Sequence, residues 1–223
     1  MVDLSKIKGA IFDADGTLFD SMWKWQSVER GYIESLGIVA EDGLEDVLRK
    51  LSQQEVAEYF KEKYGLEKSV QEITDEKNDI MELFYNNEVT LKPGTAELLE
   101  KLKSLGIKMC VATASDRYLI DAGLKRLGIF EYFETTLTCP DENTTKSVPD
   151  IFIKAANVLG TEISETAVFE DAIHGVTSAK KAGFTVVAVY DDSMANVQDE
   201  IKQLADYHFK DLSYVAPGCP QSV

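Results

Sequence analysis

The sequence has little cysteine and no long apolar segment. Its three cysteines, Cys110, Cys139 and Cys219, are an odd number without the spacing of metal ligands, so we expect no disulfide scaffold. No run of about 18 apolar residues occurs, so no transmembrane helix is expected. Asp13 and Asp15 interrupt the apolar stretch near the N-terminus, which argues against a secretory signal there. These absences favour a cytoplasmic protein without a membrane partner.

Basic residues are also scarce. The 223 residues include 39 acidic and 23 basic side chains, which gives a formal net charge of -16. Proteins that bind nucleic acid need a basic face to neutralise phosphates, so no nucleic-acid partner is expected. An anionic substrate would be repelled by such a surface unless its site supplies local positive charge.

Short apolar runs alternate with longer segments of helical periodicity. The runs are rich in β-branched residues and cover residues 9–12, 107–112, 135–138, 167–169 and 185–189. The helical segments between them follow the 3.6-residue period and end at glycines, at residues 95–105, 116–127, 149–159 and 172–182. This alternation predicts an α/β fold with a doubly wound parallel sheet of the Rossmann-like type.

One stretch breaks this alternation directly after the first predicted strand. Residues 21–89 contain no strand-like run, and their periodicity predicts helices at residues 22–36, 44–50, 53–64 and 69–86. We therefore expect two domains. Residues 1–20 and 90–223 would form the α/β catalytic core, and residues 21–89 a small all-helical cap domain inserted after the first strand.

Polar side chains stand where the predicted strands end. Ligands of open parallel sheets bind outside the carboxyl ends of the strands, so these side chains are candidates for one common site. They follow the first, second and fourth strands or lie in the loop after the third: Asp13, Asp15, Thr113, Ser115, Glu170, Asp171 and Lys146.

These residues resemble the motifs of a known superfamily. The segment Asp13-Ala14-Asp15-Gly16-Thr17 after an apolar strand resembles the first motif of the haloacid dehalogenase-like hydrolases, in their phosphoryl-transfer branch. Thr113, Lys146 and the pair Glu170-Asp171 resemble the second, third and fourth motifs, in order and in spacing. The helical insertion is similar to the cap of the subgroup that contains phosphoglycolate phosphatase and β-phosphoglucomutase. The resemblance spans essentially the whole chain.

Two positions depart from the family pattern. Ser147 follows the motif lysine where the family has a proline, which loosens the loop but leaves the amine in place. Ala172 follows the last motif where serine or threonine is frequent. We expect neither departure to alter the chemistry.

The resemblance implies a role for each core residue. A carboxylate can attack phosphorus to give an acyl phosphate, which splits one difficult step into two, and Asp13 is the expected nucleophile. Asp15 is the expected general acid for the leaving oxygen and then the general base for water. Thr113 would hydrogen-bond a phosphoryl oxygen, and Lys146 would neutralise the phosphoryl group and Asp13. The alternative for Thr113 is an N-cap of the helix that begins near Asp116, and the alternative for Lys146 is a solvated loop lysine.

The expected cofactor is Mg2+, a hard cation that prefers oxygen ligands. The predicted metal ligands are Asp13, Asp15 through its backbone carbonyl, Glu170 directly or through water, and Asp171. A different interpretation of the pair Glu170-Asp171 is that these acids only favour a helix N-terminus.

Substrate contacts are predicted in both domains. In the core they are Gly16, Ala114 and Ser115, of which Gly16 would let backbone amides approach the phosphoryl group. In the insertion they are Trp25 and Gln53, chosen from the candidates Trp23, Trp25, Arg49, Lys50, Gln53 and Gln54. A role in the helical core or on a solvated face is the alternative for each of these.

The predicted function is hydrolysis of a small phosphorylated metabolite by a monomer. A sugar-phosphate mutase that resembles β-phosphoglucomutase is the first alternative. Those mutases use a histidine at the position of Trp25 and an arginine near the position of Gln53, so both differences favour hydrolysis. A non-catalytic binding or regulatory protein on the same fold is the second, because fold alone does not imply function.

Overall fold

The computed structural model describes residues 2–48, 51 and 53–215. Arg49, Lys50 and Cys219, which were named above, lie outside these residues. The chain divides into two compact units, the first comprising Met1–Ser21 with Val89–Val223 and the second Met22–Glu88. We call the first the α/β unit and the second the helical unit. The boundaries predicted from the sequence differ from these by one residue.

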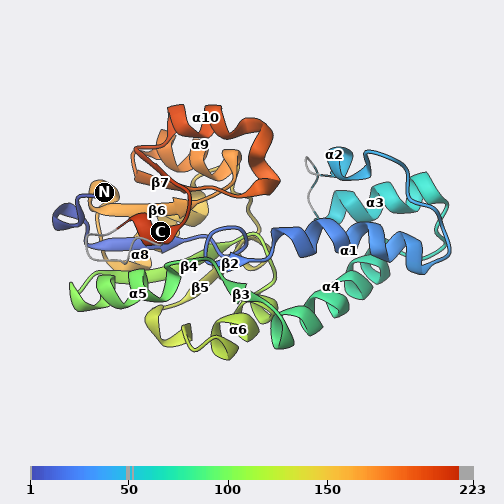
Figure 1. The fold of residues 1–223 in the computed structure, drawn as a ribbon, viewed down its shortest axis with the longest axis horizontal. Coiled ribbons are helices and arrows are strands. Elements are labelled where there is room, and N and C mark those ends of the chain that lie inside the picture. Colours follow the sequence, from blue (N-terminus) through green and yellow to red (C-terminus); the bar gives the residue numbers. More distant parts are fainter. Residues whose placement is uncertain (1, 49–50, 52, 216–223) are drawn as a thin grey trace. The chain divides into compact units, whose positions relative to one another are not determined.

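Six strands of the described chain form one parallel sheet in the α/β unit, in the order β5-β4-β1-β6-β7-β8 (Figure 1). The sheet and its flanking helices confirm the predicted α/β, doubly wound class. The strands are β1 (Gly9–Phe12), β4 (Lys108–Thr113), β5 (Thr136–Thr138), β6 (Thr166–Glu170), β7 (Thr185–Val189) and β8 (Tyr207–Phe209). The edge strand β8 was not predicted.

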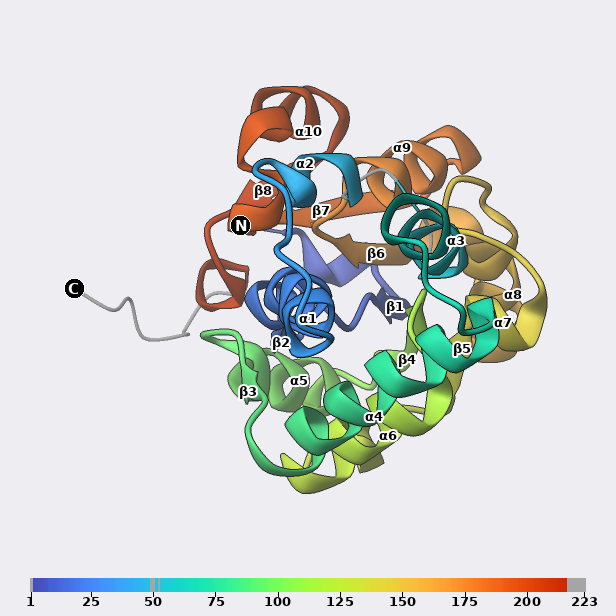
Figure 2. The ribbon, with the colours of Figure 1, turned by 90° about the vertical axis from the view of Figure 1, so that its right-hand side faces the viewer.

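Helices cover both faces of this sheet, as Figures 1 and 2 show. One face carries α8 (Asp150–Leu159), α9 (Ile173–Ala182) and α10 (Gln198–Leu204), and their apolar side chains share one core with the strands. The other face carries α5 (Thr95–Ser104) and α6 (Arg117–Arg126). Because both faces are covered, all four residues of β1 are buried, which is why the central strands read as continuous apolar runs.

The remaining short elements of the α/β unit lie at its loops. The helix α7 (Cys139–Glu142) follows β5, and 3-10 helices occur at Leu4–Lys6, Phe130–Tyr132, Ile163–Glu165, Asp192–Val197 and Leu212–Tyr214. Cys110 and Cys139 are both buried and unpaired, which agrees with the absence of a disulfide scaffold in the described chain.

The two connections to the helical unit pair with each other. The strands β2 (Phe19–Asp20) and β3 (Thr90–Leu91) form a two-stranded antiparallel ladder, which was not predicted. The backbone N–H of Lys92 continues this tie by donating to the carbonyl of Leu18. A ladder of two residues per strand is too short to leave a pattern in the sequence.

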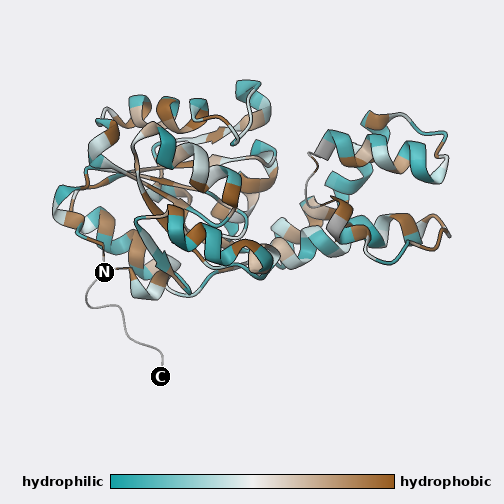
Figure 3. Cartoon of the chain, turned by 90° about the horizontal axis from the view of Figure 1, so that it is seen from above, coloured by the Kyte–Doolittle hydropathy of each residue, from teal (hydrophilic) through white to brown (hydrophobic). Residues whose placement is uncertain are grey.

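The helical unit contains α1 (Met22–Ser35), α2 (Leu44–Leu48), α3 (Gln53–Tyr64) and α4 (Val70–Asn87). Brown and teal alternate along these helices in Figure 3, as expected for helices that each bury one face. Tyr32, Phe60 and Ile73 are among the residues of the apolar core. Ser69 begins α4 through a capping box with Glu72, in which each side chain accepts a backbone N–H at the other residue.

No helix within the described ranges is long and apolar enough to cross a membrane.

Candidate active site

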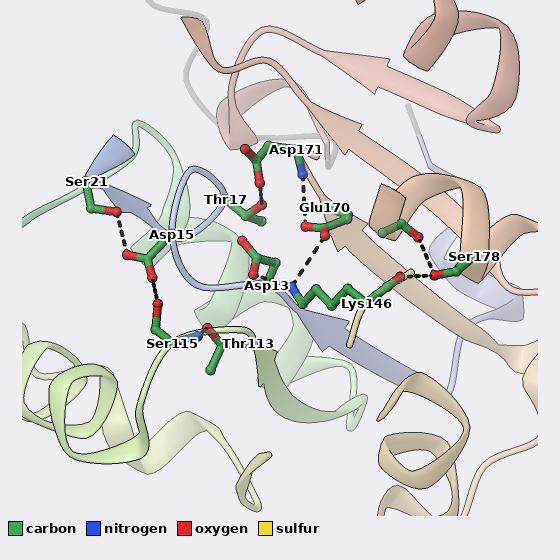
Figure 4. Close-up of polar contacts among 11 residues, drawn as sticks. Asp13, Asp15, Thr17, Ser21, Thr113, Ser115, Lys146, Glu170, Asp171 and Ser178 are labelled. Atoms are coloured by element: carbon green, nitrogen blue, oxygen red, sulfur yellow. Dashed lines mark hydrogen bonds and ion pairs between the residues drawn. The ribbon is translucent and has the colours of Figure 1, made fainter. Parts of the chain in front are cut away.

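Three carboxylates meet at the carboxyl ends of β1 and β6 (Figure 4). Phe12 of β1 is paired in register with Phe169 of β6, so the residues that follow them, Asp13 and Glu170, leave the sheet side by side. Asp171 is next along the chain. One oxygen of each carboxylate lies within 4.8 Å of the others, and all three residues are buried. We call Asp13, Glu170 and Asp171 the acid cluster.

Lys146 reaches the acid cluster from the loop before α8. Its ammonium donates to Asp13 and lies 3.4 Å from Oε1 of Glu170. The Ser178 hydroxyl of α9 donates to the Lys146 carbonyl at 2.5 Å, and the ammonium lies 5.8 Å from the centre of the Phe152 ring. These contacts hold the buried Lys146 side chain in place, although its neighbours Thr145 and Ser147 are exposed.

The acid cluster has an uncompensated negative charge. Among the described residues it sets three carboxylates against one ammonium, a net charge of -2 when all four groups are ionised. Burial raises the pKa of Asp13 to about 7, against the opposing effect of Lys146. Burial, followed by the charges of Glu170 and Asp13, raises the pKa of Asp171 well above its ordinary value. Burial also raises the pKa of Glu170, although Lys146 opposes this.

For Lys146 the neighbouring charges, rather than burial, decide the direction of the pKa shift. Burial alone would lower the pKa of its ammonium, but the charges of Asp13 and Glu170 outweigh burial and raise it. The lysine therefore stays protonated and supplies the local positive charge that an anionic substrate requires.

The acid cluster fits a divalent cation. Oδ2 of Asp13 is buried without a hydrogen-bond partner in the part of the chain that the structure describes, and such an orphaned acceptor is costly unless something occupies it. The donors are all carboxylate oxygens, the type that Mg2+ prefers. A cation of charge +2 would neutralise the cluster and would satisfy this oxygen.

Two glycines make room for the carboxylates. A Cβ at Gly16 would collide with the carboxylate of Asp171, and a Cβ at Gly175 would collide with that of Glu170. Gly16 also has a φ of 90°, a conformation that other residues rarely adopt. Both positions therefore require glycine if the carboxylates are to keep these places.

Asp15 is held apart from the acid cluster. The hydroxyls of Ser21 and Ser115 each donate to one of its oxygens, to Oδ1 and Oδ2 respectively, both at 2.6 Å (Figure 4). Its carboxylate therefore does not join Asp13 and Asp171 as a ligand, so that a metal contact would have to use its backbone carbonyl. Two carboxylates two residues apart thus have different surroundings.

Thr113 ends β4 close to this pair of serines. Its side-chain oxygen accepts the backbone N–H of Ser115 at 3.1 Å, and the residue is buried. Its own hydroxyl hydrogen is not used by that bond, so it remains a donor for a ligand. Ala114 is exposed beside it.

The two residues predicted in the insertion belong to the helical unit. Trp25 is buried there, and its indole N–H donates to the Tyr85 hydroxyl at 3.1 Å. This favours a packing role for Trp25. Gln53 begins α3, but its side chain lies outside what the structure describes.

The alternative interpretation, that Glu170 and Asp171 favour a helix N-terminus, stays a prediction, because both residues stand directly before α9 and Oε2 of Glu170 accepts the backbone N–H of Asp171 at 3.1 Å. The N-cap of α9 is Ala172, which makes no side-chain capping bond. The side chains of the two acids lie in the acid cluster.

Comparison with known proteins decides the family. A model of the haloacid dehalogenase-like hydrolases matches residues 7–183, which is more than three quarters of the chain. The chain belongs to this family. It is therefore an enzyme of the hydrolase class, as the motifs predicted.

Relatives of this hydrolase are found in distant organisms. The Bacillus subtilis protein named "Putative phosphatase YhcW" is 30% identical over 82% of this chain and 83% of its own length. The "Phosphorylated carbohydrates phosphatase" of Thermotoga maritima is 28% identical over 79% of this chain and 82% of its own. A family IA hydrolase structure from Entamoeba histolytica has a TM-score of 0.81 at 21% identity, covering 95% of this chain and 96% of its own, which is a likeness of fold.

Four residues that support the site of this hydrolase were not predicted from the sequence. Thr17 donates to Oδ1 of Asp171 at 3.3 Å, and the other three are Ser21, Gly175 and Ser178. Gly175 left one signal, because glycine is a poor helix former, so that a glycine inside a predicted helix indicates a close approach of another group. The three hydroxyls left none, since their partners are set by the tertiary fold.

Replacing Asp171 by asparagine is expected to stabilise the cation-free protein. Folding raises the pKa of Asp171, so the protonated carboxyl favours the folded state at low pH. This contribution to the free energy of unfolding is lost as pH rises from about 4 towards the raised pKa. Asparagine keeps the acceptor for Thr17 but carries no charge. We expect Asp171→Asn to raise the free energy of unfolding at pH 8 by about 1–3 kcal/mol, and by less at about pH 5. Urea denaturation in EDTA measures both values.

A matched control is Asp79→Asn, which removes an exposed carboxylate from α4 and should leave the free energy of unfolding unchanged. If Asp171→Asn has the same free energy of unfolding as the wild type at pH 8, or a lower one, the buried charge of Asp171 does not destabilise the folded protein.

Proposed function

We propose that this hydrolase is a Mg2+-dependent phosphatase that removes the phosphoryl group from a small phosphorylated metabolite through an aspartyl-phosphate on Asp13. The observation that supports this best is the pairing of a buried acid cluster around Asp13 with a separately held carboxylate, Asp15. Phosphoryl transfer by this route needs a nucleophile beside a cation and a second acid that manages protons. The names of the relatives, which are phosphatases, agree with this proposal.

Asp13, Asp171 and Glu170 would hold the Mg2+, with the backbone carbonyl of Asp15 as a further ligand. When bound, the ion would neutralise charge on the phosphoryl oxygens and on the acid cluster. Lys146 adds a fixed ammonium beside the nucleophile. Together these groups offset the repulsion that a strongly acidic protein exerts on an anionic ester.

The first step forms a bond between a carboxylate oxygen of Asp13 and phosphorus while the bond from phosphorus to the leaving oxygen breaks. The leaving oxygen takes a proton from Asp15, and the alcohol departs. Thr113 donates its hydroxyl hydrogen to a phosphoryl oxygen. The backbone N–H of Ala114 would approach another oxygen, whereas the N–H of Gly16 now donates to the Phe19 carbonyl and that of Ser115 to Oγ1 of Thr113.

The second step hydrolyses the aspartyl-phosphate. Asp15, now ionised, takes a proton from a water molecule whose oxygen attacks phosphorus. The bond between phosphorus and Asp13 breaks, inorganic phosphate leaves, and Asp15 is again protonated for the next cycle. To donate a proton, Asp15 must exchange at least one of the hydrogen bonds from Ser21 and Ser115, because both now donate to it.

Hydrolysis is favoured over a mutase reaction by the state of Trp25. The polar atom of this residue is already bonded to Tyr85 inside the helical unit. It therefore supplies no second acid or base for returning the phosphoryl group to a sugar. The substrate we propose is a phosphorylated carbohydrate or similar small ester. A monomer located in the cytoplasm, with Mg2+ as its only cofactor, is part of the same proposal.

Asp13→Asn is expected to lower kcat by at least about a thousandfold, because an amide oxygen is a far weaker nucleophile. Phosphate release from a panel of sugar phosphates, with Mg2+ or with EDTA, measures this. The wild type should release phosphate only with Mg2+, and the variant should keep its circular dichroism spectrum. Wild-type turnover in Asp13→Asn would exclude the aspartyl-phosphate, and turnover in EDTA would exclude the metal.

Asp15→Asn should discriminate between leaving groups. An alkyl phosphate needs a proton on its leaving oxygen, so its phosphorylation step should slow by about 10²–10⁴-fold. A nitrophenyl phosphate releases a stable phenolate, so it should still phosphorylate Asp13. Because hydrolysis also lacks its base, the phosphoenzyme should accumulate, as a nitrophenol burst and a mass increase of the protein would show. An equal loss for both substrates without a burst would contradict the role of Asp15.

A further inference from the structure

A second buried lysine lies at the same end of the sheet as the acid cluster. Lys92 follows β3, and its ammonium lies 2.7 Å from Oδ2 of Asp191 and donates to the Tyr190 carbonyl at 2.8 Å. Oδ1 of Asp191 accepts the backbone N–H of Ser193 at 2.9 Å. The side chains of Lys92 and Asp191 are 9% and 8% exposed, so this ion pair is almost completely removed from solvent.

Stability is a weak reason for keeping such a pair. Taking two charges out of water costs about as much as their mutual attraction returns, and apolar replacements are often neutral or stabilising. Lys92 also holds the chain through its backbone bond to Leu18 and through the bond from its ammonium to the Tyr190 carbonyl, neither of which uses the charge of Asp191. The charges of the pair therefore point to a role beyond holding the fold.

The sheet register shows what these charges face. Glu170 of β6 is paired with Ala188 of β7, so Asp171 and Asp191 both follow neighbouring parallel strands at their carboxyl ends. Asp191 is thus a further carboxylate at the end of the sheet that holds the acid cluster, and Lys92 offsets its charge.

We propose that Lys92 is a positioning residue that acts through Asp191 to set the charge of the cation site. The inference rests on the proposed function, since it concerns how tightly that site holds Mg2+. With Lys92 in place, Asp191 adds no net charge to the acid cluster. Without Lys92, the ionised Asp191 would make the surroundings of Asp171 more negative. Without Asp191, the buried ammonium would make them more positive.

The two single variants are therefore expected to change Mg2+ affinity in opposite directions. Calorimetric titration of the full chain with Mg2+, without substrate at pH 8, measures this. Asp191→Asn should bind Mg2+ about fivefold more weakly, and Lys92→Met about fivefold more tightly, because a unit charge nearby attracts or repels a divalent cation. The double variant Lys92→Met/Asp191→Asn should lie within about twofold of the wild type, because both charges are gone.

The chain offers a control pair that has the same charges, although its side chains are 68% and 34% exposed. Lys8 and Glu165 form an ion pair with the same 2.7 Å separation, but they precede β1 and β6 and so lie at the opposite end of the sheet. Lys8→Met should leave Mg2+ affinity unchanged. Urea denaturation of each variant in EDTA reports any loss of folding separately from the change in affinity.

A merely structural pair would give a different result, in which both single variants bind Mg2+ more weakly as the fold loosens. That outcome, or unchanged affinity in both, overturns the role proposed for Lys92. Even then, the proposed metal site would be supported if the wild type binds Mg2+ saturably and Asp171→Asn abolishes this binding. If the wild type binds no Mg2+, the proposed metal site fails, and this inference fails with it.

Discussion

The buried negative charge at the carboxyl ends of β1 and β6 is the constraint on which the rest of the site depends. Pairing of two central strands places Asp13 and Glu170 side by side, and Asp171 follows directly. Lys146 is the ammonium that contacts this cluster in the described chain, and it leaves a net negative charge. Such charge is unfavourable in a protein interior without a compensating ion. The divalent cation that we propose would compensate this charge.

Asp13 and Asp15 have different surroundings, which suit the two different roles proposed for them. Asp13 is buried beside Lys146 and has an unpartnered oxygen, as a nucleophile and metal ligand requires. Asp15 is bound by two hydroxyls that can be exchanged for a substrate oxygen or for water. Different surroundings for neighbouring carboxylates are the usual means of assigning acid, base and nucleophile roles. The apolar strands around them supply the stability that this site does not.

Much of the fold could be predicted because its central strands and helices leave strong patterns. The bounds of β1, β7 and α3 were predicted to the residue, since each has a clear apolar run or helical period. The strand β8 was missed because Tyr207–Phe209 is short and only half buried at the sheet edge. The candidate residues of the core were predicted from their places after the strands. The hydroxyls of Thr17, Ser21 and Ser178, and the pairing of Lys92 with Asp191, depend on contacts between distant segments, which no local pattern encodes.

The most direct test of this account is whether Mg2+ binding by the wild-type protein releases protons. Because the pKa of Asp13 is raised to about 7 without a cation, part of the acid cluster is protonated near neutral pH. Calorimetric titration with Mg2+ at pH 7, in two buffers of different ionisation enthalpy, measures the number released. The account predicts one Mg2+ per chain and a fraction of a proton or more released, with less release at pH 8.5. Saturable binding without proton release, or no saturable binding, would contradict the claim that the buried carboxylates form the cation site.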